Sequence, residues 1–172
     1  MWRWVFCGLW FPLLLGAQPT PDVFDLARKG SEEAVRLVLA TQPRAFDCVS
    51  PAGFTPLILA CYKGNTPVVK VLLEAGVAVN YTSDQGTALM AAVVRGNAEV
   101  VGLLLDAKAD PNLTDVQGNT ALHFAVQFKN TAIIQNLLAH GARREAKDGK
   151  GMTAFEYAVQ SGDEAIIALL KG

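Results

Sequence analysis

The sequence contains few of the residues that usually carry chemistry. It has three cysteines and two histidines among 172 residues, and no C-x-x-C motif, G-x-S-x-G elbow or phosphate-binding glycine loop. Two histidines in different sequence contexts cannot supply the three or four converging ligands of a metal site. We therefore expect no catalytic residue, no cofactor and no metal ion, and the chain is not predicted to be an enzyme.

Charge is also scarce. Charged residues make up 18% of the chain, the formal net charge is −1, and Lys and Arg form no block. Proteins that bind nucleic acid usually cluster basic residues to displace counterions, so neither a nucleic-acid partner nor a small-molecule substrate is expected, although a local basic patch stays open. Hydrophobic residues reach 51%, which is enough for an apolar core.

One hydrophobic run stands apart at the N-terminus. It extends over residues 5–15, follows a single positive charge at Arg3 and ends before Gly16-Ala17-Gln18. It is shorter than the roughly 20 residues that a membrane-spanning helix needs. The pattern predicts a signal peptide over residues 1–17, with cleavage after Ala17. An uncleaved membrane anchor is the alternative.

The rest of the chain repeats itself. Similar segments are GFTPLILACYKGN from Gly53, GTALMAAVVRGN from Gly86, GNTALHFAVQFKN from Gly118 and GMTAFEYAVQSGD from Gly151. Their threonines, Thr55, Thr87, Thr120 and Thr153, are 32, 33 and 33 residues apart. A fixed period of this length is typical of a solenoid.

Each copy has the signals of two helices. The threonine can cap the first helix, and Gly64, Gly96 and Gly162 can end it with a positive φ. An apolar stripe at helical spacing then predicts a second helix at 67–76 and in the other copies. One such unit cannot bury both faces, whereas stacked units share a continuous core.

These copies resemble the ankyrin repeat family, and the resemblance covers nearly all of residues 18–172. It implies an all-α solenoid of stacked helix-turn-helix pairs with short hairpin loops. The expected units are an N-terminal cap repeat at about 22–48, repeats at about 50–82, 83–114 and 115–147, and a C-terminal cap repeat at 148–172 with a polar outer face. In this family the histidine of the T-x-L-H pattern, here His123, braces its loop, and Asn80 and Asn112 hold loop positions.

Several residues depart from the repeat pattern. Lys108 replaces a helix-ending glycine, which predicts a different helix end, and Lys129 replaces another, which predicts strain or an altered turn. One residue is missing between Gly86 and Thr87, so that loop should be shorter.

Two further expectations concern the loop aspartates and the cysteines. Turn formation is expected for Asp84, Asp115 and Asp148, and burial for Cys48 and Cys61, with a disulfide between the two cysteines as an open alternative.

The resemblance implies binding of another protein through a concave face, which loop tips and the exposed sides of the first helices would form. Carried over by position, the predicted partner-binding residues are Phe54, Tyr62, Lys63, Val94, Arg95, Gln117, Asn119, Gln127, Phe128 and Met152. Phe128 is a preferred contact, and His140 is expected at a solvated helix end.

The family includes small exported bacterial proteins. N-x-T sequons at Asn80 and Asn112, where a glycan would disturb the loop, favour a bacterial periplasm over a eukaryotic secretory pathway. We expect a monomeric periplasmic module that is an immunity or inhibitor protein for a cell-wall-acting or lipid-acting enzyme, or a support factor for an oxidative-stress enzyme. Alternatives are a membrane-tethered scaffold and an effector delivered to a host.

Overall fold

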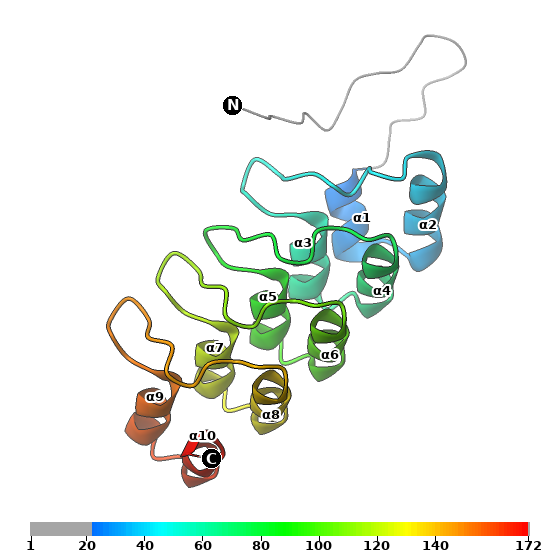
Figure 1. The fold of residues 1–172 in the computed structure, drawn as a ribbon. Helices are drawn as coiled ribbons and strands as arrows, with labels where there is room; N and C mark the ends of the chain where they lie inside the picture. The colour runs from blue at the N-terminus through cyan, green and yellow to red at the C-terminus, as the bar shows by residue number, and fades with distance from the viewer. Residues whose placement is uncertain (1–21, 172) are drawn as a thin grey trace, which may run out of the picture.

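The computed structural model describes residues 22–171, so the signal peptide expected over residues 1–17 lies outside the described part. Over the described residues the chain forms five helix pairs, as Figure 1 shows. The bounds are α1 Val23–Lys29, α2 Glu32–Thr41, α3 Pro56–Lys63, α4 Thr66–Glu74, α5 Ala88–Val94, α6 Ala98–Asp106, α7 Ala121–Gln127, α8 Thr131–Ala139, α9 Ala154–Ser161 and α10 Glu164–Lys171. The β structure of residues 22–171 is limited to two isolated β-bridges, one in the loop before α5 and one in the loop before α9.

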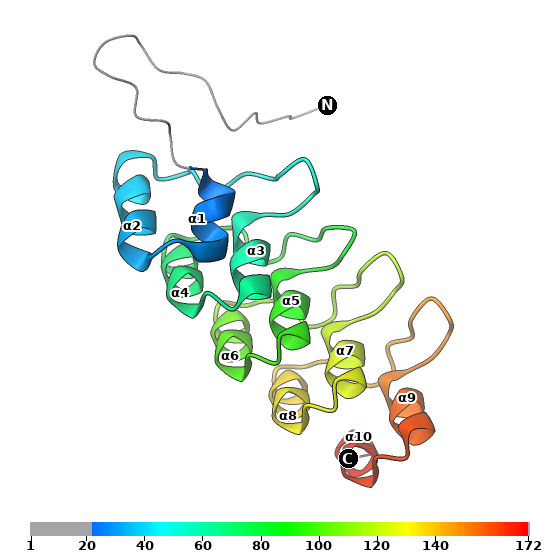
Figure 2. The ribbon, with the colours of Figure 1, turned by 180° about the vertical axis from the view of Figure 1, so that it is seen from behind.

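The helices form two layers. The first helices of the pairs, α1, α3, α5, α7 and α9, pack in sequence along one layer, and the second helices pack along the other. The hairpin loops project from the first layer to one side of the stack (Figures 1 and 2). Between the layers lies one continuous apolar core, which includes the fully buried Val68, Leu104 and Ile133. The predicted all-α stack is confirmed.

The caps predicted from the sequence are present. The Thr55 and Thr87 hydroxyls accept hydrogen bonds from the backbone N–H groups of Ile58 and Met90, at 3.2 and 3.3 Å. Each bond satisfies one of the donors that a helix N-terminus leaves without a partner. At the other end, Gly64 closes α3 with φ 71°. The local sequence therefore determines where each first helix begins and ends.

The prediction that the helix end at Lys108 closes differently is wrong. Lys108 adopts φ 67°, close to the 74° of Gly76 at the equivalent helix end. The hydrogen bonds also match, because Lys108 N–H donates to the Leu105 carbonyl at 2.9 Å, as Gly76 N–H does to that of Leu73 at 3.0 Å. The stack imposes the left-handed turn on a residue that does not favour it.

Lys129 also keeps the left-handed turn, with φ 54°. We predict that Lys129→Gly raises the free energy of unfolding by up to about 1 kcal/mol, because glycine removes the steric cost of positive φ but loses more chain entropy on folding. Urea unfolding of the variant measures the change. Gly64→Lys, which introduces the same strain at a matched turn, should lower the stability, and a destabilising Lys129→Gly would contradict the argument.

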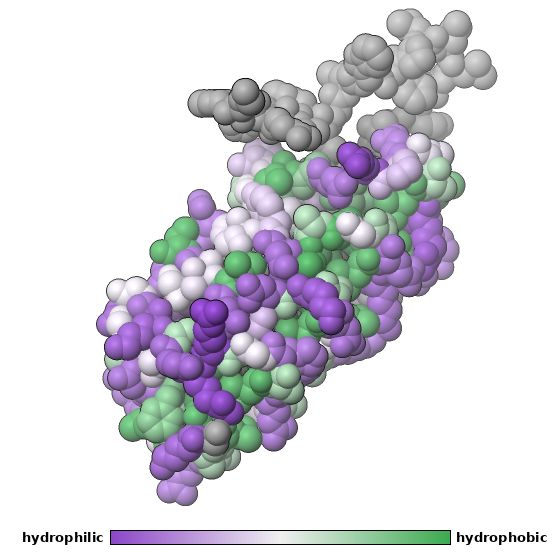
Figure 3. All heavy atoms as spheres, viewed as in Figure 1, coloured by the Kyte–Doolittle hydropathy of each residue, from purple (hydrophilic) through white to green (hydrophobic). Residues whose placement is uncertain are grey.

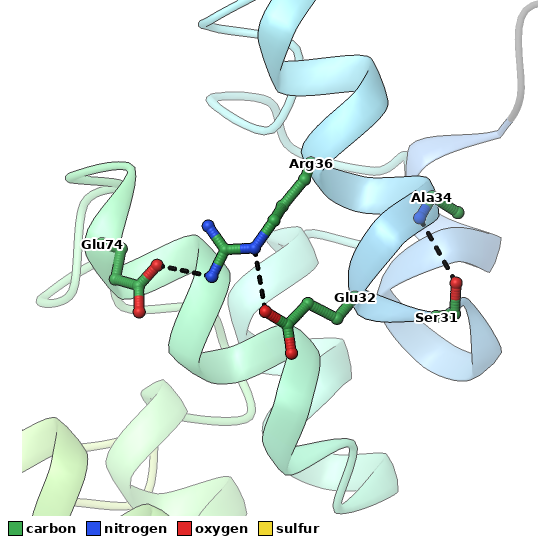
Figure 4. Close-up of polar contacts among 5 residues, drawn as sticks. All are labelled: Ser31, Glu32, Ala34, Arg36 and Glu74. Atoms are coloured by element: carbon green, nitrogen blue, oxygen red, sulfur yellow. Dashed lines mark hydrogen bonds and ion pairs between the residues drawn. The ribbon is translucent and has the colours of Figure 1, made fainter.

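Ion pairs join successive second helices on the outer layer. The Arg36 guanidinium lies 2.8 Å from Glu32 on its own helix and 2.8 Å from Glu74 on α4, as Figure 4 shows. Lys70 on α4 lies 2.7 Å from Glu99 on α6. These side chains are about half exposed and solvent screens their charges, so the pairs align neighbouring helices more than they stabilise the fold.

The loop asparagines connect neighbouring repeats. The Asn80 amide donates to the Lys108 carbonyl at 3.1 Å, and its oxygen accepts from Asp110 N–H at 2.8 Å. Asn112 makes the same pair of bonds one repeat further on, with Gly141 and Arg143. The partners lie about one repeat away in sequence, so each asparagine joins its own loop to the next repeat.

Two smaller expectations have different outcomes. Cys61 is fully buried and burial raises the pKa of its thiol, while Cys48 is 5% exposed; within the described chain the two are not bonded to each other.

The outer face of the last repeat is less polar than predicted. Val159 on α9 is 52% exposed, whereas its counterpart Val126 on α7 is covered by the following repeat and is 3% exposed.

Candidate functional site

The loop tips and the first helices enclose a hollow that we call the apolar groove. Its volume is about 610 Å³. Its lining is Arg28, Phe54, Ile58, Leu59, Tyr62, Lys63, Asp84, Gln85, Thr87, Met90, Ala91, Val94, Asp115, Val116, Gln117 and Phe124. It therefore reaches across four consecutive first helices, α1, α3, α5 and α7, and the tips of two loops. Stacking brings together residues from separate repeats, none of which forms a groove alone.

Hydrogen bonds within and between the loops hold the loop wall of this groove. The Asp115 carboxylate accepts from the N–H groups of Gln117 and Asn119 at 2.9 and 2.8 Å, which closes its own turn. Val116 N–H donates to the Asp84 carbonyl of the preceding loop at 3.4 Å. Asx turns of this kind fix a loop without a regular strand. The tip of each loop is therefore held in place before any partner binds.

Asp84 lies in a turn as expected, but its side chain does not close that turn. In that loop Ser83 closes the turn, because its hydroxyl accepts from Gln85 N–H at 3.2 Å and donates to the Gly86 carbonyl at 2.8 Å. Asp115 and Asp148 form the turns predicted for them. The missing residue beside Thr87 shifts the register by one, and the loop is shorter as expected, with Ser83 and Gly86 bonded to each other. The Asp84 side chain is thereby left exposed on the groove wall.

A second hollow, the polar groove, lies further along the stack. Its volume is about 580 Å³, and its lining is Gln117, Asn119, His123, Phe124, Gln127, Asp148, Gly149, Lys150 and Tyr157. Amide side chains supply much of this surface. The two grooves share Gln117 and Phe124, so together they form one surface along the stack.

His123 braces its own helix against the next loop. The ring is 4% exposed, and its Nδ1 accepts from the backbone N–H of Thr120 at 3.1 Å. The ring proton therefore sits on Nε2, which donates to the Met152 carbonyl at 3.1 Å in the next loop. One side chain thus caps its own helix and connects two repeats. His140, by contrast, lies exposed just after α8, as predicted.

Asp148 is held in its charged form. The Tyr157 hydroxyl donates to its carboxylate at 2.5 Å, and the N–H groups of Met152 and Lys150 donate at 2.9 Å. The tyrosine bond is the main reason why the pKa of Asp148 lies below its usual value; it also raises the pKa of Tyr157. The same carboxylate thus closes a turn and fixes an aromatic ring on α9.

Acid should weaken this contact. A lowered carboxyl pKa contributes stability above the unfolded-state pKa of about 3.9, and that stability is lost as the pH falls through the folded-state value. We predict that Tyr157→Phe is less stable than the parent protein near neutral pH and that the difference shrinks as the pH is lowered from about 7 to below about 3.9. Thermal unfolding across this range measures it. A difference independent of pH would contradict the assignment.

Seven of the ten predicted contact residues line one of the two grooves. The apolar groove contains Phe54, Tyr62, Lys63, Val94 and Gln117, and the polar groove contains Gln117, Asn119 and Gln127. Tyr62, at 53% exposure, is an accessible aromatic of the first set, whereas Phe54 is half-buried against the core. Arg95, Phe128 and Met152 line neither groove, although Phe128 is 52% exposed. Their roles as partner contacts stay predictions.

Other residues of the apolar groove were not foreseen. Val116 is 69% exposed at a loop tip, and an apolar residue inside the polar run TDVQGN was a usable signal. Arg28 on α1 stands one repeat before Tyr62 and lines the same groove. Phe124 could not be identified from sequence, because only the next loop determines how much of its ring stays open.

Figure 3 shows one face of the molecule with hydrophobic residues reaching the surface in separate places among hydrophilic ones. Among residues 22–171, no cluster of His, Cys, Asp or Glu is arranged to hold a metal ion. Over the same range, none of the helices has both the length and the apolar character needed to span a membrane.

Comparison with known proteins decides the family. The family model for ankyrin repeats in three copies matches residues 23–115 and 107–172. The chain belongs to the ankyrin repeat family. Ankyrin repeats are protein–protein interaction modules, so the grooves are candidate partner sites. The family match and the stacked helix pairs together confirm the predicted ankyrin-repeat solenoid.

Curated relatives match a part of this ankyrin stack. Oxysterol-binding protein-related protein 1 of Rattus norvegicus and of Mus musculus is 45% identical over 67 residues, and that of Homo sapiens is 43% identical. Each match covers 34% of this chain and 7% of the relative. The likeness therefore concerns a short segment of much longer proteins.

Proposed function

We propose that this ankyrin protein is a non-catalytic binding module that docks a partner protein in the apolar groove. The observation that carries the proposal is the groove itself, which places the exposed Tyr62, Val94 and Val116 beside one hollow. Aromatic and aliphatic groups in a concave site exclude water when a partner side chain enters, and such residues often dominate binding energy. The relatives' name refers to oxysterol binding, but the match covers only 7% of their length, so we propose no oxysterol ligand for this chain.

The cellular setting belongs to the same proposal. We place the protein in a bacterial periplasm, exported through residues 1–17, as an inhibitor of a cell-wall-acting or lipid-acting enzyme or as a support factor for an oxidative-stress enzyme. Support comes from the sequence of the leader and from Asn80 and Asn112, whose amides are engaged in inter-repeat bonds. N-terminal sequencing that finds Gln18 first would support export, while an intact leader would favour a membrane-tethered scaffold.

Docking in the groove predicts a specific loss. Tyr62→Ser together with Val116→Ser should reduce partner affinity at least ~tenfold, because both side chains are exposed and lose their apolar contact with the partner. The control is Leu37→Ser with Val159→Ser, which are 70% and 52% exposed and line neither groove. Affinity is measured by titration with the partner recovered from periplasmic extract.

Both double variants should keep the thermal stability of the parent protein, which separates binding from folding. Equal affinity of the groove variant and the control would refute the proposal. The activity of the recovered partner distinguishes the two roles: an inhibitor abolishes the partner's activity at saturation, and a support factor leaves it intact.

A further inference from the structure

Basic side chains follow the C-terminal ends of three consecutive first helices. Lys63 is the last residue of α3, Arg95 caps α5, and Lys129 comes directly after the cap of α7. All three are exposed, and within residues 22–171 none of them takes part in an ion pair. Because α3 packs on α5 and α5 on α7, they form a row along the stack, which we call the basic row.

The basic row meets the apolar groove. Lys63 belongs to both, with its ammonium 5.9 Å from the centre of the Tyr62 ring, and Arg28 lines the same groove from α1. Arg28 is paired with Asp25 at 2.9 Å, so Lys63 is the cation at this end that is available to a partner. A favourable helix dipole explains why each helix tolerates a cation at its C-terminus, but it does not supply a counter-charge in contact with the side chain.

The opposite wall has the opposite charge. Asp84 and Asp115 stand at the loop tips of the same groove. The Asp115 carboxylate is engaged in its turn, while Asp84 accepts a hydrogen bond only through its backbone carbonyl among the described contacts. The groove is therefore apolar in its floor and acidic along the loop tips, and the basic row begins inside it at Lys63 and continues beyond its lining at Arg95 and Lys129.

From this arrangement we infer that the docked partner segment is acidic and apolar: an apolar side chain enters the groove while neighbouring carboxylates face Lys63, Arg95 and Lys129. This inference rests on the proposed function, because it specifies the chemistry of the same docking site. The acidic loop tips disfavour a continuous polyanion such as nucleic acid, since its phosphates would pass Asp84. Because the formal net charge of the chain is only −1, we expect the basic row to provide the electrostatic attraction for an acidic partner segment.

The test starts from a display library of random twelve-residue peptides selected on the full chain. The selected peptides should be enriched in Asp and Glu next to Leu, Phe or Trp. The best peptide, carrying a fluorescent label, is then titrated by anisotropy. Affinity should fall at least ~tenfold between about 0.05 and 0.5 M salt, because salt screens exposed charges.

Charge reversal supplies the decisive comparison. Lys63→Glu, Arg95→Glu and Lys129→Glu together should weaken the selected peptide at least ~30-fold through loss of attraction and added repulsion. The control reverses three exposed cations that line neither groove, Arg44, Arg144 and Lys171, and so changes the net charge equally. It should change affinity less than about threefold. Both triple variants are checked for unchanged thermal unfolding.

The outcomes separate this inference from the proposed function. Selected peptides that are neutral or basic, an unchanged affinity after reversal of the basic row, or tighter binding of a twelve-nucleotide thymidine strand would overturn the inference. If such peptides still lose affinity in the Tyr62→Ser and Val116→Ser variant, the docking proposal stands without it. If no peptide depends on the groove, both fall.

Discussion

Leu104→Ala lowers the free energy of unfolding by about 2–5 kcal/mol, the cost of a cavity at a fully buried leucine. Leu104 is fully buried on α6, which packs against α4, α5 and α8. The removed methyl groups therefore leave a void where three neighbouring helices meet. In a solenoid each repeat contacts only its neighbours, so a void in the central repeat weakens the interfaces on both sides.

Urea unfolding followed by far-ultraviolet circular dichroism measures this loss. Leu37→Ala is the matched control, because it removes the same atoms from a side chain that is 70% exposed. Its effect should stay within about 0.5 kcal/mol. Similar losses for the two variants would show that the repeats do not share the continuous core described above.

His123→Ala lowers the free energy of unfolding by about 1–3 kcal/mol, because the buried Thr120 N–H loses its partner and the Met152 carbonyl keeps only its bond from Asp148 N–H at 2.9 Å. The Thr120 N–H loses its acceptor at Nδ1, and the Met152 carbonyl loses its donor at Nε2. The second loss lies in another repeat, so the variant should also loosen the loop before α9.

Hydrogen exchange locates that second effect. Amides around Met152 should exchange faster in the His123→Ala variant, although the mutation lies 29 residues away in sequence. His140→Ala, which changes an exposed histidine, should leave both stability and exchange near the parent values. Faster exchange confined to the loop before α7 would contradict the bridging role of His123.

The repeat was readable from the sequence because each unit carries its own signals. The threonine cap and the closing glycine are local signals, and residues 53–64 show both with no reference to the rest of the chain. The helix end at Lys108 was predicted wrongly because the sequence of one repeat does not show the contacts that its neighbours make with it. Contacts on both sides of a repeat hold its helix end in one conformation, so a residue with a poor preference for positive φ still adopts it.

The site was less predictable than the fold. Its parts come from different repeats, and their meeting depends on the register between repeats. Position in the repeat placed Tyr62 and Val94 at the apolar groove, but it also suggested Phe128 and Met152, which line neither groove. A single missing residue beside Thr87, visible in the 32-residue spacing between Thr55 and Thr87, exchanged the roles of Ser83 and Asp84.

Cross-linking tests the central claim of partner docking in the apolar groove most directly. A photo-reactive phenylalanine analogue is placed at Val94 in the groove or at Glu99 on α6 in the outer layer, and each variant is irradiated with the purified partner. The account predicts a covalent complex from position 94 and little from position 99. Cross-linking that is equal at both positions, or stronger from position 99, would contradict it.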